Sequence, residues 1–517
     1  MKIELLHALP TELRVQVEQE WQRLSRSEQR LALENKLLRD KLRLLRIEKY
    51  GPKSEQLSDA QLELLEGEPG VVRAEIESEA QRAPGETTEV EKVRRRAHPG
   101  RTELPAHLPR RETVLVCTPE QCRCAQCGAA KAVIGYDCAE ELDVEPAVYF
   151  VRVTKREKRA CKQCAELGVS TAPAAGPKIV EKSKASNRVI VDAIIDKYCN
   201  HLPLYRQCAI LEREAGLELS RMTLCGWVLQ GGLWLEAISG ALRAELLAGT
   251  YIQADETTVK VQSERTVGRN HQGYLWEYSR PGGAVVFDFQ MGRSREGPRQ
   301  FLGGFNGILQ SDGYAAYDDL GGPGLTHAGC LAHARRGFVD ALKVTPEDPA
   351  AKAILAEFGR LYAVEKQARE SALSCGERAH LRRLRSVPVL TGLQEKIIVL
   401  RQGVLPQSVL GKACDYALGQ WARLILYASH GEVEIDNNWC ENAIRPIAVG
   451  RKNWLHIGSE QAGPRIAAIM SVIETCRRLG INVRDYLMDV LPRIPSWPAR
   501  RIAELTPQAW AAAQASP

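Results

Sequence analysis

The sequence predicts a multidomain protein whose largest part is an α/β domain. The chain has 517 residues, enough for about three or four domains. Two C-x-x-C pairs in its N-terminal half indicate a small metal-binding domain. From residue 250, strand-like runs and helical patterns follow in the order strand, strand, strand, helix, strand and then helices. This order is typical of an α/β fold.

The composition favours a cytoplasmic protein without a membrane partner. The chain is 44% hydrophobic and 26% charged, with a net charge of only +6, so binding to nucleic acid would need locally concentrated positive charge. Its start is too polar for a signal peptide, and no apolar run is long enough to span a membrane. The odd number of cysteines, 15, favours free thiols and a metal site over a disulfide framework.

Residues 15–65 are predicted to form a helical, coiled-coil segment. Leucine recurs every seven residues at Leu24, Leu31, Leu38 and Leu45. Asn35 lies on the other seam, where a buried Asn can fix the register of paired helices. A coiled coil between protomers, and hence a homo-oligomer, is favoured over an amphipathic helix packed on its own chain.

Residues 66–111 are predicted to be a basic linker. Its end, "EKVRRRAHPGRTELPAHLPRR", holds seven Lys or Arg against two Glu. Such a run can contact phosphates or remain a solvated tether, and both alternatives stay open.

Residues 112–172 are predicted to be a zinc-binding domain. Four thiolates from two C-x-x-C pairs can close one tetrahedral structural zinc site, with Cys122 and Cys138 as competing ligands. A redox pair or unligated thiols are the alternatives. The alternating run "VYFVRVTKREK", residues 148–158, is typical of a strand with basic residues facing outward. The predicted ligands are Cys124, Cys127, Cys161 and Cys164.

Residues 180–245 have helix-ending and helix-capping residues at the positions expected of a helix-turn-helix-like domain. A helix ends before Pro203, a second ends at Gly216, and Ser220 is placed to cap a third. The last helix has few polar side chains. A structural helical layer therefore remains an alternative to DNA reading.

Two acids on neighbouring strands form a candidate cation site. Asp255 interrupts the first strand-like run of the α/β region, and Asp312 follows the fourth. Two carboxylates side by side repel unless a proton or cation lies between them, and Mg²⁺ prefers such oxygen ligands. Glu256 points to the opposite face of its strand and is not expected to be a ligand.

A third acid is available in "EIDNNWCENAIRPIAVGRKNW". Asp436 is predicted to cap a helix that ends at Pro446. Asn437, Glu441 and Arg445, spaced four apart, would then share one helix face. Three carboxylates with two metal ions can support in-line displacement at phosphorus. The alternative is that these acids are solvated or paired with basic side chains.

The chain resembles the transposases of insertion-sequence family 66 from end to end. The resemblance is carried in order by "YGPKSEQLSDAQLELL", the cysteine segment, "HLPLYRQ", "ADETTVKV", "LQSDGYAAYD", "GCLAHARRGFVDA", "LPQSVLGKACDYALGQW" and "EIDNNWCENAIRPIAVGRKNWLHIGSEQAG". Two positions depart from the family pattern: His456 replaces the usual Phe, and Asn442 replaces an Arg and so removes one possible phosphate contact.

This resemblance implies a ribonuclease H-like catalytic core over residues 250–484, with a helical insertion at about 340–430 and a C-terminal tail at 485–517. It places the family's acidic triad on Asp255, Asp312 and Glu441. The implied cofactors are catalytic Mg²⁺ or Mn²⁺ and structural Zn²⁺.

The implied activity is cleavage at the ends of a mobile DNA element and strand transfer into target DNA. The implied partners are the element's terminal inverted repeats and target DNA, with accessory proteins of the same element. A ribonuclease H-like nuclease that cuts without joining and a non-catalytic DNA-binding regulator are the alternatives.

Several further residues are candidates with weaker arguments. Cys330 and His333 form a C-x-x-H pair without an evident complementary pair, so structural packing near the sheet is favoured over a second metal site. Basic side chains near the acids are candidates for DNA backbone contact, against ordinary solvated helix faces. These are Arg335, Arg336, Arg445, Arg451 and Lys452.

Overall fold

The computed structural model describes parts of residues 20–39, residues 126, 129–130, 148–160, 169–173, 176–263, 269–318 and 320–515. Contacts divide the chain into two units, residues 82–155 and the remainder, which are treated separately below. The predicted linker and the four predicted zinc cysteines lie outside the described residues.

The N-terminal segment is helical over the described part of residues 20–39. Leu24, Leu31 and Leu38 are 56%, 55% and 57% exposed. A helix that leaves such a leucine row exposed within one chain is suited to pairing with another. The coiled coil itself stays a prediction.

The strand predicted for residues 148–158 is largely wrong. Residues 148–157 form no strand, and Val148, Phe150 and Val151 are strongly exposed. A strand needs a partner for its backbone hydrogen bonds. Pairing starts only at β1 (Lys158–Ala160), which lies antiparallel to β2 (Val169–Thr171).

A mixed five-stranded sheet forms the centre of the α/β domain, in the order β5-β4-β3-β6-β7. Within this sheet β3–β4 and β4–β5 pair antiparallel, while β3–β6 and β6–β7 are parallel. The strands are β3 (Tyr251–Val261), β4 (His271–Ser279), β5 (Val285–Gln290), β6 (Ile308–Ser311) and β7 (Thr326–Gly329). The fifth strand was not predicted from the sequence.

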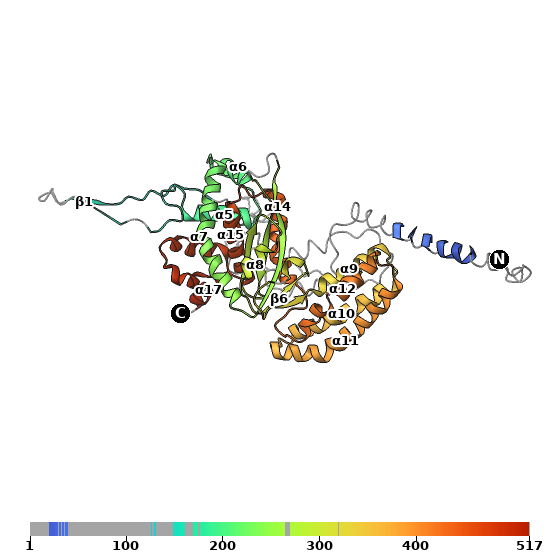
Figure 1. The fold of residues 1–517 in the computed structure, drawn as a ribbon. Coiled ribbons are helices and arrows are strands. Elements are labelled where there is room, and N and C mark those ends of the chain that lie inside the picture. Colours follow the sequence, from blue (N-terminus) through green and yellow to red (C-terminus); the bar gives the residue numbers. More distant parts are fainter. Residues whose placement is uncertain are drawn as a thin grey trace, which may run out of the picture. The chain divides into compact units, whose positions relative to one another are not determined.

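Where β3 pairs with β6, the two faces of the sheet pack into two different cores. Ile252, Ala254 and Leu309 pack into a core shared with the long helices α7 (Arg221–Leu247) and α15 (Ala462–Arg478). Tyr251 and Ile308, which alternate with them along the strands, pack into the core of the helical insertion. Figure 1 shows the insertion helices, in yellow to orange, gathered on one side of the sheet.

The helices before the sheet begin and end close to the predicted residues. Ser220 caps the third helix by accepting a hydrogen bond from Thr223 N, and Gly216 ends the second with a left-handed φ of 64°. The third helix buries one side in the core, so most of its length is a structural layer. The helices are α5 (Asn187–Tyr198), α6 (Leu204–Ala215) and α7 (Arg221–Leu247).

The helical insertion connects the end of β7 to the helix that carries the third acid. Its elements are α9 (Leu331–Val344), α10 (Pro349–Glu370), α11 (Cys375–Gly403), α12 (Val409–Gly419), α13 (Trp421–Leu424) and η3 (Leu426–Ala428). Short helices α8 (Glu296–Leu302) and η2 (Ala315–Tyr317) flank β6. After the insertion come α14 (Asn438–Trp454), α15 (Ala462–Arg478), α16 (Val483–Arg493), η4 (Ile494–Ser496), η5 (Ala499–Leu505) and α17 (Pro507–Ala515).

Helix α15 also closes one edge of the sheet. β5 is an edge strand, and its outward backbone N–H groups at Val285 and Phe287 donate to the hydroxyls of Thr475 and Ser471, at 3.0 and 2.8 Å. These two hydroxyls lie four residues apart and therefore on one face of the helix. Two of the edge donors that a neighbouring strand would use are thus already satisfied.

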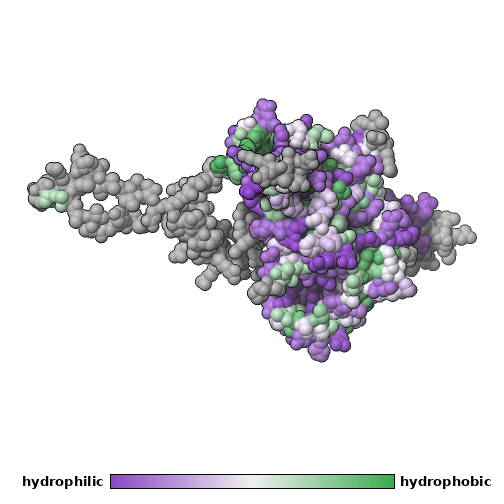
Figure 2. All heavy atoms as spheres, turned by 90° about the vertical axis from the view of Figure 1, so that its left-hand side faces the viewer, coloured by the Kyte–Doolittle hydropathy of each residue, from purple (hydrophilic) through white to green (hydrophobic). Residues whose placement is uncertain are grey.

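No helix within the described residues is both long and apolar enough to cross a membrane. On the face drawn in Figure 2, hydrophobic side chains occur in small patches among hydrophilic ones.

Candidate active site

Asp255 lies in the middle of β3, the central strand, opposite Glu277 of β4. Its Oδ1 accepts a hydrogen bond from the Glu256 backbone N–H at 2.8 Å. Burial and, to a smaller extent, the negative charges of Glu441, Glu256 and Asp312 together raise the pKa of Asp255 to about 8. A carboxyl held among other carboxyls and away from water favours a proton or a cation as its partner.

Asp312 follows β6 directly, and β6 lies parallel to β3. The Asp312 side chain accepts from Tyr314 N at 2.9 Å, while its carbonyl accepts from the Tyr416 hydroxyl at 2.6 Å. Gly313 follows with a φ of 87°, where an L side chain is strained. The tight turn and the bond from α12 fix Asp312 at the carboxyl end of its strand.

Glu441 lies in the first turn of α14, where a carboxylate interacts favourably with the helix dipole. Its Oε2 is 3.5 Å from Arg336 Nη2, and its Oε1 is 3.7 Å from His333 Nδ1. Both Arg336 and His333 come from α9. Oε1 is buried and has no hydrogen-bond partner among the residues that the structure describes.

The structure therefore brings the three predicted acids together from three elements. Asp255 is close enough to both Asp312 and Glu441 for their charges to raise its pKa. His333 lies near the same acids, because the negative charges of Glu441 and Asp312 both raise its pKa. Burial has the larger effect and lowers that pKa. A pocket of about 380 Å³ opens beside Asp312 and His333, with Lys412 and Tyr416 in its wall.

The prediction that Asp436 caps a helix ending at Pro446 is wrong in two respects. The N-cap position is Asn437, while the Asp436 carboxylate accepts from Asn438 N at 3.1 Å. The helix also continues through Pro446 to Trp454. Proline removes one donor and bends a helix, but the turns on either side of it remain helical here.

The segment before α14 is held across the sheet by buried polar side chains. Gln253 of β3 donates to Asp436 O, and Gln310 of β6 donates to Glu434 O, each at 2.9 Å. Asn437 donates from its side chain to Ala254 O at 3.1 Å. These bonds position the start of α14 and therefore Glu441. The alternation of Gln253 with apolar neighbours in β3 was a signal of this role that sequence reasoning missed.

A buried ionic cluster holds the same segment from the side of the insertion. Arg378 of α11 donates to Glu434 and to Glu365 of α10, and Arg382 also donates to Glu365. Burial alone would raise the pKa of Glu434, yet Arg378 and Arg369 lower it to about 2. The insertion is thereby tied to the residues that lead into α14.

The carboxylate of Glu256, next to Asp255, accepts hydrogen bonds from other side chains of the protein. Arg293 donates to its Oε1 and the Tyr317 hydroxyl donates to its Oε2 at 2.9 Å. This agrees with the prediction that Glu256 faces away from the site.

The predicted basic residues lie in several different environments. Arg336 is exposed and faces Glu441, while Lys452 is exposed near the end of α14. Arg335 and Arg445 are half-buried. Arg451 bonds within the protein, to the Thr258 carbonyl at 2.7 Å and to Thr257 Oγ1 at 2.9 Å. Arg451 is therefore less available for a phosphate than its neighbour Lys452.

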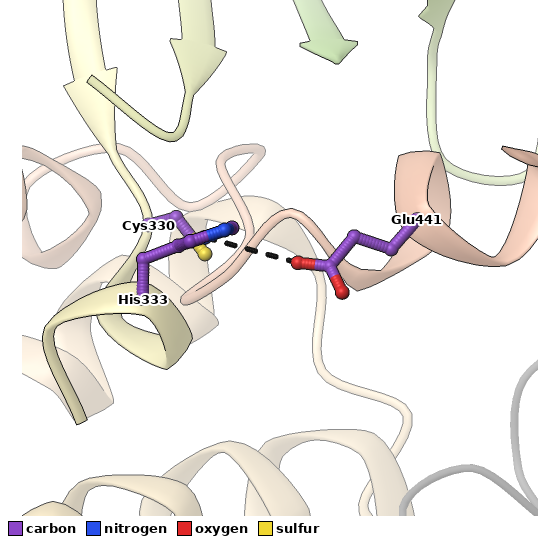
Figure 3. A group of neighbouring side chains, drawn as sticks. All are labelled: Cys330, His333 and Glu441. Atoms are coloured by element: carbon purple, nitrogen blue, oxygen red, sulfur yellow. Dashed lines mark ion pairs between the residues drawn. The ribbon is translucent and has the colours of Figure 1, made fainter. Parts of the chain in front are cut away.

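Cys330 and His333 lie against Glu441, an association that their spacing did not reveal. Cys330 is buried at the junction of β7 and α9, and its Sγ accepts from Asn437 N at 3.3 Å. The ligand atoms of Cys330, His333 and Glu441 all lie within 4.8 Å of one another. Figure 3 shows the three side chains pointing toward one another, with the ion pair between His333 and Glu441 drawn as a dashed line.

Comparison with known families identifies the chain. A sequence model described as "Transposase IS66 family" matches residues 182–465, more than half of the chain. The chain belongs to the IS66 transposase family. Further matches to this IS66 protein are "Transposase C of IS166 homeodomain" at residues 37–113, "zinc-finger binding domain of transposase IS66" at 121–165 and "IS66 C-terminal element" at 471–508.

Curated relatives of this IS66-family chain come from Sinorhizobium fredii (strain NBRC 101917 / NGR234). The uncharacterized protein y4jD is 34% identical over 430 residues, covering 80% of this chain and 82% of its own length. The uncharacterized protein y4qI is 33% identical over 488 residues, covering 90% and 87%. The family match thus supports a transposase with a zinc-binding domain, while the relatives' printed names record no activity.

Proposed function

We propose that this IS66-family protein cuts DNA at the ends of an insertion sequence and joins those ends to target DNA, using Asp255, Asp312 and Glu441. The observation that carries the proposal is the convergence of these three carboxylates from β3, the end of β6 and α14. The raised pKa of Asp255, caused by burial and by the other two acids, supports a cationic partner at this place.

We assign the α/β domain to the ribonuclease H-like class. Three antiparallel strands followed by two parallel ones support this assignment. The position of the first acid on the central strand and of the second after its parallel neighbour supports it too. So does the helical insertion that lies between the second and third acids.

The residues present fit divalent cations such as Mg²⁺ or Mn²⁺. Asp255, Asp312 and Glu441 would hold such ions, and Glu441 would offer Oε1, which is buried and has no hydrogen-bond partner among the described residues. Such cations supply the Lewis acidity and charge neutralisation that displacement at phosphorus requires. Hard oxygen ligands of this kind are those that Mg²⁺ prefers.

The remaining side chains around the acids would position DNA. Arg336 and Lys412 place positive charge beside Glu441 and along the pocket wall, where they can meet backbone phosphates. Lys452 offers an exposed cation at the end of α14. Water would hydrolyse a phosphodiester at the element end and free a 3′-hydroxyl. That hydroxyl would then attack a phosphodiester of target DNA in line, and the 3′-oxygen of the cut target strand would leave. No covalent intermediate with a protein side chain is required.

The segments outside the α/β domain would recognise and pair element ends. Four cysteines would hold one structural zinc, in agreement with the zinc-finger family match at residues 121–165. The N-terminal helix, with its exposed leucine row, would pair two protomers so that two DNA ends are held together. The proposed zinc ligands are Cys124, Cys127, Cys161 and Cys164.

The test is strand transfer on labelled element-end DNA with Mg²⁺ or Mn²⁺. The proposal predicts product from wild type and none from Asp255→Asn, Asp312→Asn or Glu441→Gln, with DNA binding retained in all. Glu256→Gln is the matched control, because it neutralises an adjacent carboxylate on the other strand face and should keep activity.

The outcomes also separate the alternative functions. Cleavage without joining would identify a nuclease. DNA binding without cleavage, even after accessory proteins of the element are added, would identify a regulator. Wild-type activity in one of the three carboxylate variants would remove that residue from the site.

A further inference from the structure

His333 and Glu441 bring two buried polar atoms close together without a hydrogen bond between them. His333 Nδ1 lies 3.7 Å from Glu441 Oε1, beyond hydrogen-bond distance. Both atoms are buried and neither has a hydrogen-bond partner within the described part of the chain. An unsatisfied buried polar atom costs about 1–3 kcal/mol, so two of them at one place call for a ligand.

The spacing and chemistry of these atoms fit a metal ion. Two ligand atoms of one cation, each bound at about 2.0–2.2 Å, lie roughly 3–4 Å apart. The other carboxylate oxygen, Oε2, faces Arg336, so Oε1 is the oxygen left for an ion. Asp312 lines the same pocket as His333 and can add a third ligand.

We propose that His333 is a metal ligand of the active site, and that its Nδ1 and Glu441 Oε1 together hold one divalent transition-metal ion. This inference rests on the proposed function, because it shares Glu441 with the carboxylate site. It adds a nitrogen ligand to a site otherwise made of oxygens. With Nδ1 on the ion, the ring proton is on Nε2.

A nitrogen ligand changes which ions the site selects. Imidazole binds first-row transition metals well, whereas Mg²⁺ and Ca²⁺ prefer oxygen. The site should therefore bind Mn²⁺ more tightly than Mg²⁺, and His333 should account for much of that difference. Cys330 Sγ is within 4.8 Å of both ligand atoms but already accepts the Asn437 backbone N–H. The ion is accordingly placed beside the thiol and not on it.

The experiment is electron paramagnetic resonance of Mn²⁺ added to the full-length, zinc-loaded protein without DNA. Wild type should bind Mn²⁺ and show coupling to a directly bonded nitrogen. His333→Ala should lose the nitrogen coupling and bind Mn²⁺ at least about tenfold more weakly, with a smaller change for Mg²⁺. His380→Ala, at an exposed histidine of α11, is the matched control and should behave as wild type.

The outcomes distinguish this inference from the proposed function. Mn²⁺ binding that needs the three acids but shows no nitrogen coupling would refute the role of His333 and leave the carboxylate site intact. Nitrogen coupling that disappears in His333→Ala, in a protein without strand transfer, would establish the ligand and reject the activity. No Mn²⁺ binding by wild type would overturn the inference. If His333→Ala does not fold, His333→Gln answers the same question, because it keeps a polar side chain of similar length but has no imidazole.

Discussion

Replacing Asp255 by asparagine should stabilise the protein while abolishing its chemistry. The pKa of Asp255 rises from 3.8 to about 8 in the folded chain, chiefly through burial and then through the neighbouring acids. Because the folded pKa is the higher one, the group's contribution to stability is full below pH 3.8 and is lost as pH rises through about 8. Asparagine has a similar shape and no charge, so the Asp255→Asn variant escapes this loss.

The size of the effect follows from the pKa. At about 1.36 kcal/mol per pH unit, a carboxyl with these two pKa values weakens the folded state by at most about 5–6 kcal/mol near pH 8. Asp255 is only partly shielded from solvent, and water reaching it reduces the penalty. We therefore expect a gain of about 1–3 kcal/mol, or roughly 2–10 °C in the melting temperature of a domain of this size.

The assay is calorimetry of the zinc-loaded chain without added Mg²⁺, at about pH 6 and about pH 8.5. The gain of Asp255→Asn over wild type should be larger at the higher pH, and added Mg²⁺ should raise only the wild-type melting temperature. Glu256→Gln is the control with the opposite sign, because it loses charge-assisted bonds from Arg293. A melting temperature for Asp255→Asn at or below that of wild type at the higher pH would refute the reasoning.

Four further predictions concern other parts of the molecule. Arg378→Ala should destabilise by about 3 kcal/mol in denaturant unfolding, because it leaves buried Glu434 with less compensating charge; a loss below about 1 kcal/mol would argue against the ionic cluster. Gly313→Ala should cost about 1–2 kcal/mol and reduce cleavage at least tenfold, because φ is 87° beside Asp312; unchanged cleavage would show that this turn does not position the acid. Cys161→Ser should lower zinc content from about one per chain, measured by elemental analysis, and full retention would exclude this ligand. Lys452→Ala should reduce the salt slope of DNA binding by about one, and an unchanged slope would remove it from the DNA contacts.

The sequence alone predicted the local elements of the α/β domain well where patterns were strong. Strand-like alternation located β3, β4, β5 and β6, and the Ser220 cap and Gly216 turn fell where expected. β7 was missed because "THAG" is four residues long and poor in β-branched side chains. The strand expected at 148–158 was overpredicted, since alternation describes a strand only when a partner is present.

The candidate site was accessible from the sequence only in part. The two aspartates on adjacent strands follow from the α/β pattern. The spacing in the later helix offered Glu441 as a third acid, and the family resemblance placed the triad on it. The structure brings these three together, and their catalytic role stays a prediction. The contact of His333 with Glu441 spans a helical insertion. No local spacing encodes a contact across so many residues, because it depends on how the insertion packs against the sheet.

Helix continuation through Pro446 illustrates a second limit. Local propensity predicts a helix end at that residue, yet burial of Cys440, Ile444 and Ile447 in the core keeps both flanking turns in place. Packing thus overrides a preference of about 3 kcal/mol that a local pattern would treat as decisive.

The hydroxyls of Ser471 and Thr475 on the edge of β5 have a consequence for solubility and for the fate of incomplete chains. An open strand edge invites other chains to add strands and aggregate. Here backbone N–H groups of that edge donate to a helix late in the chain. The edge therefore stays without these hydrogen bonds until translation has passed residue 475. A copy of the gene interrupted before that point would encode an aggregation-prone fragment. Proteases would remove this fragment, so it would not compete with the full-length protein for the DNA ends.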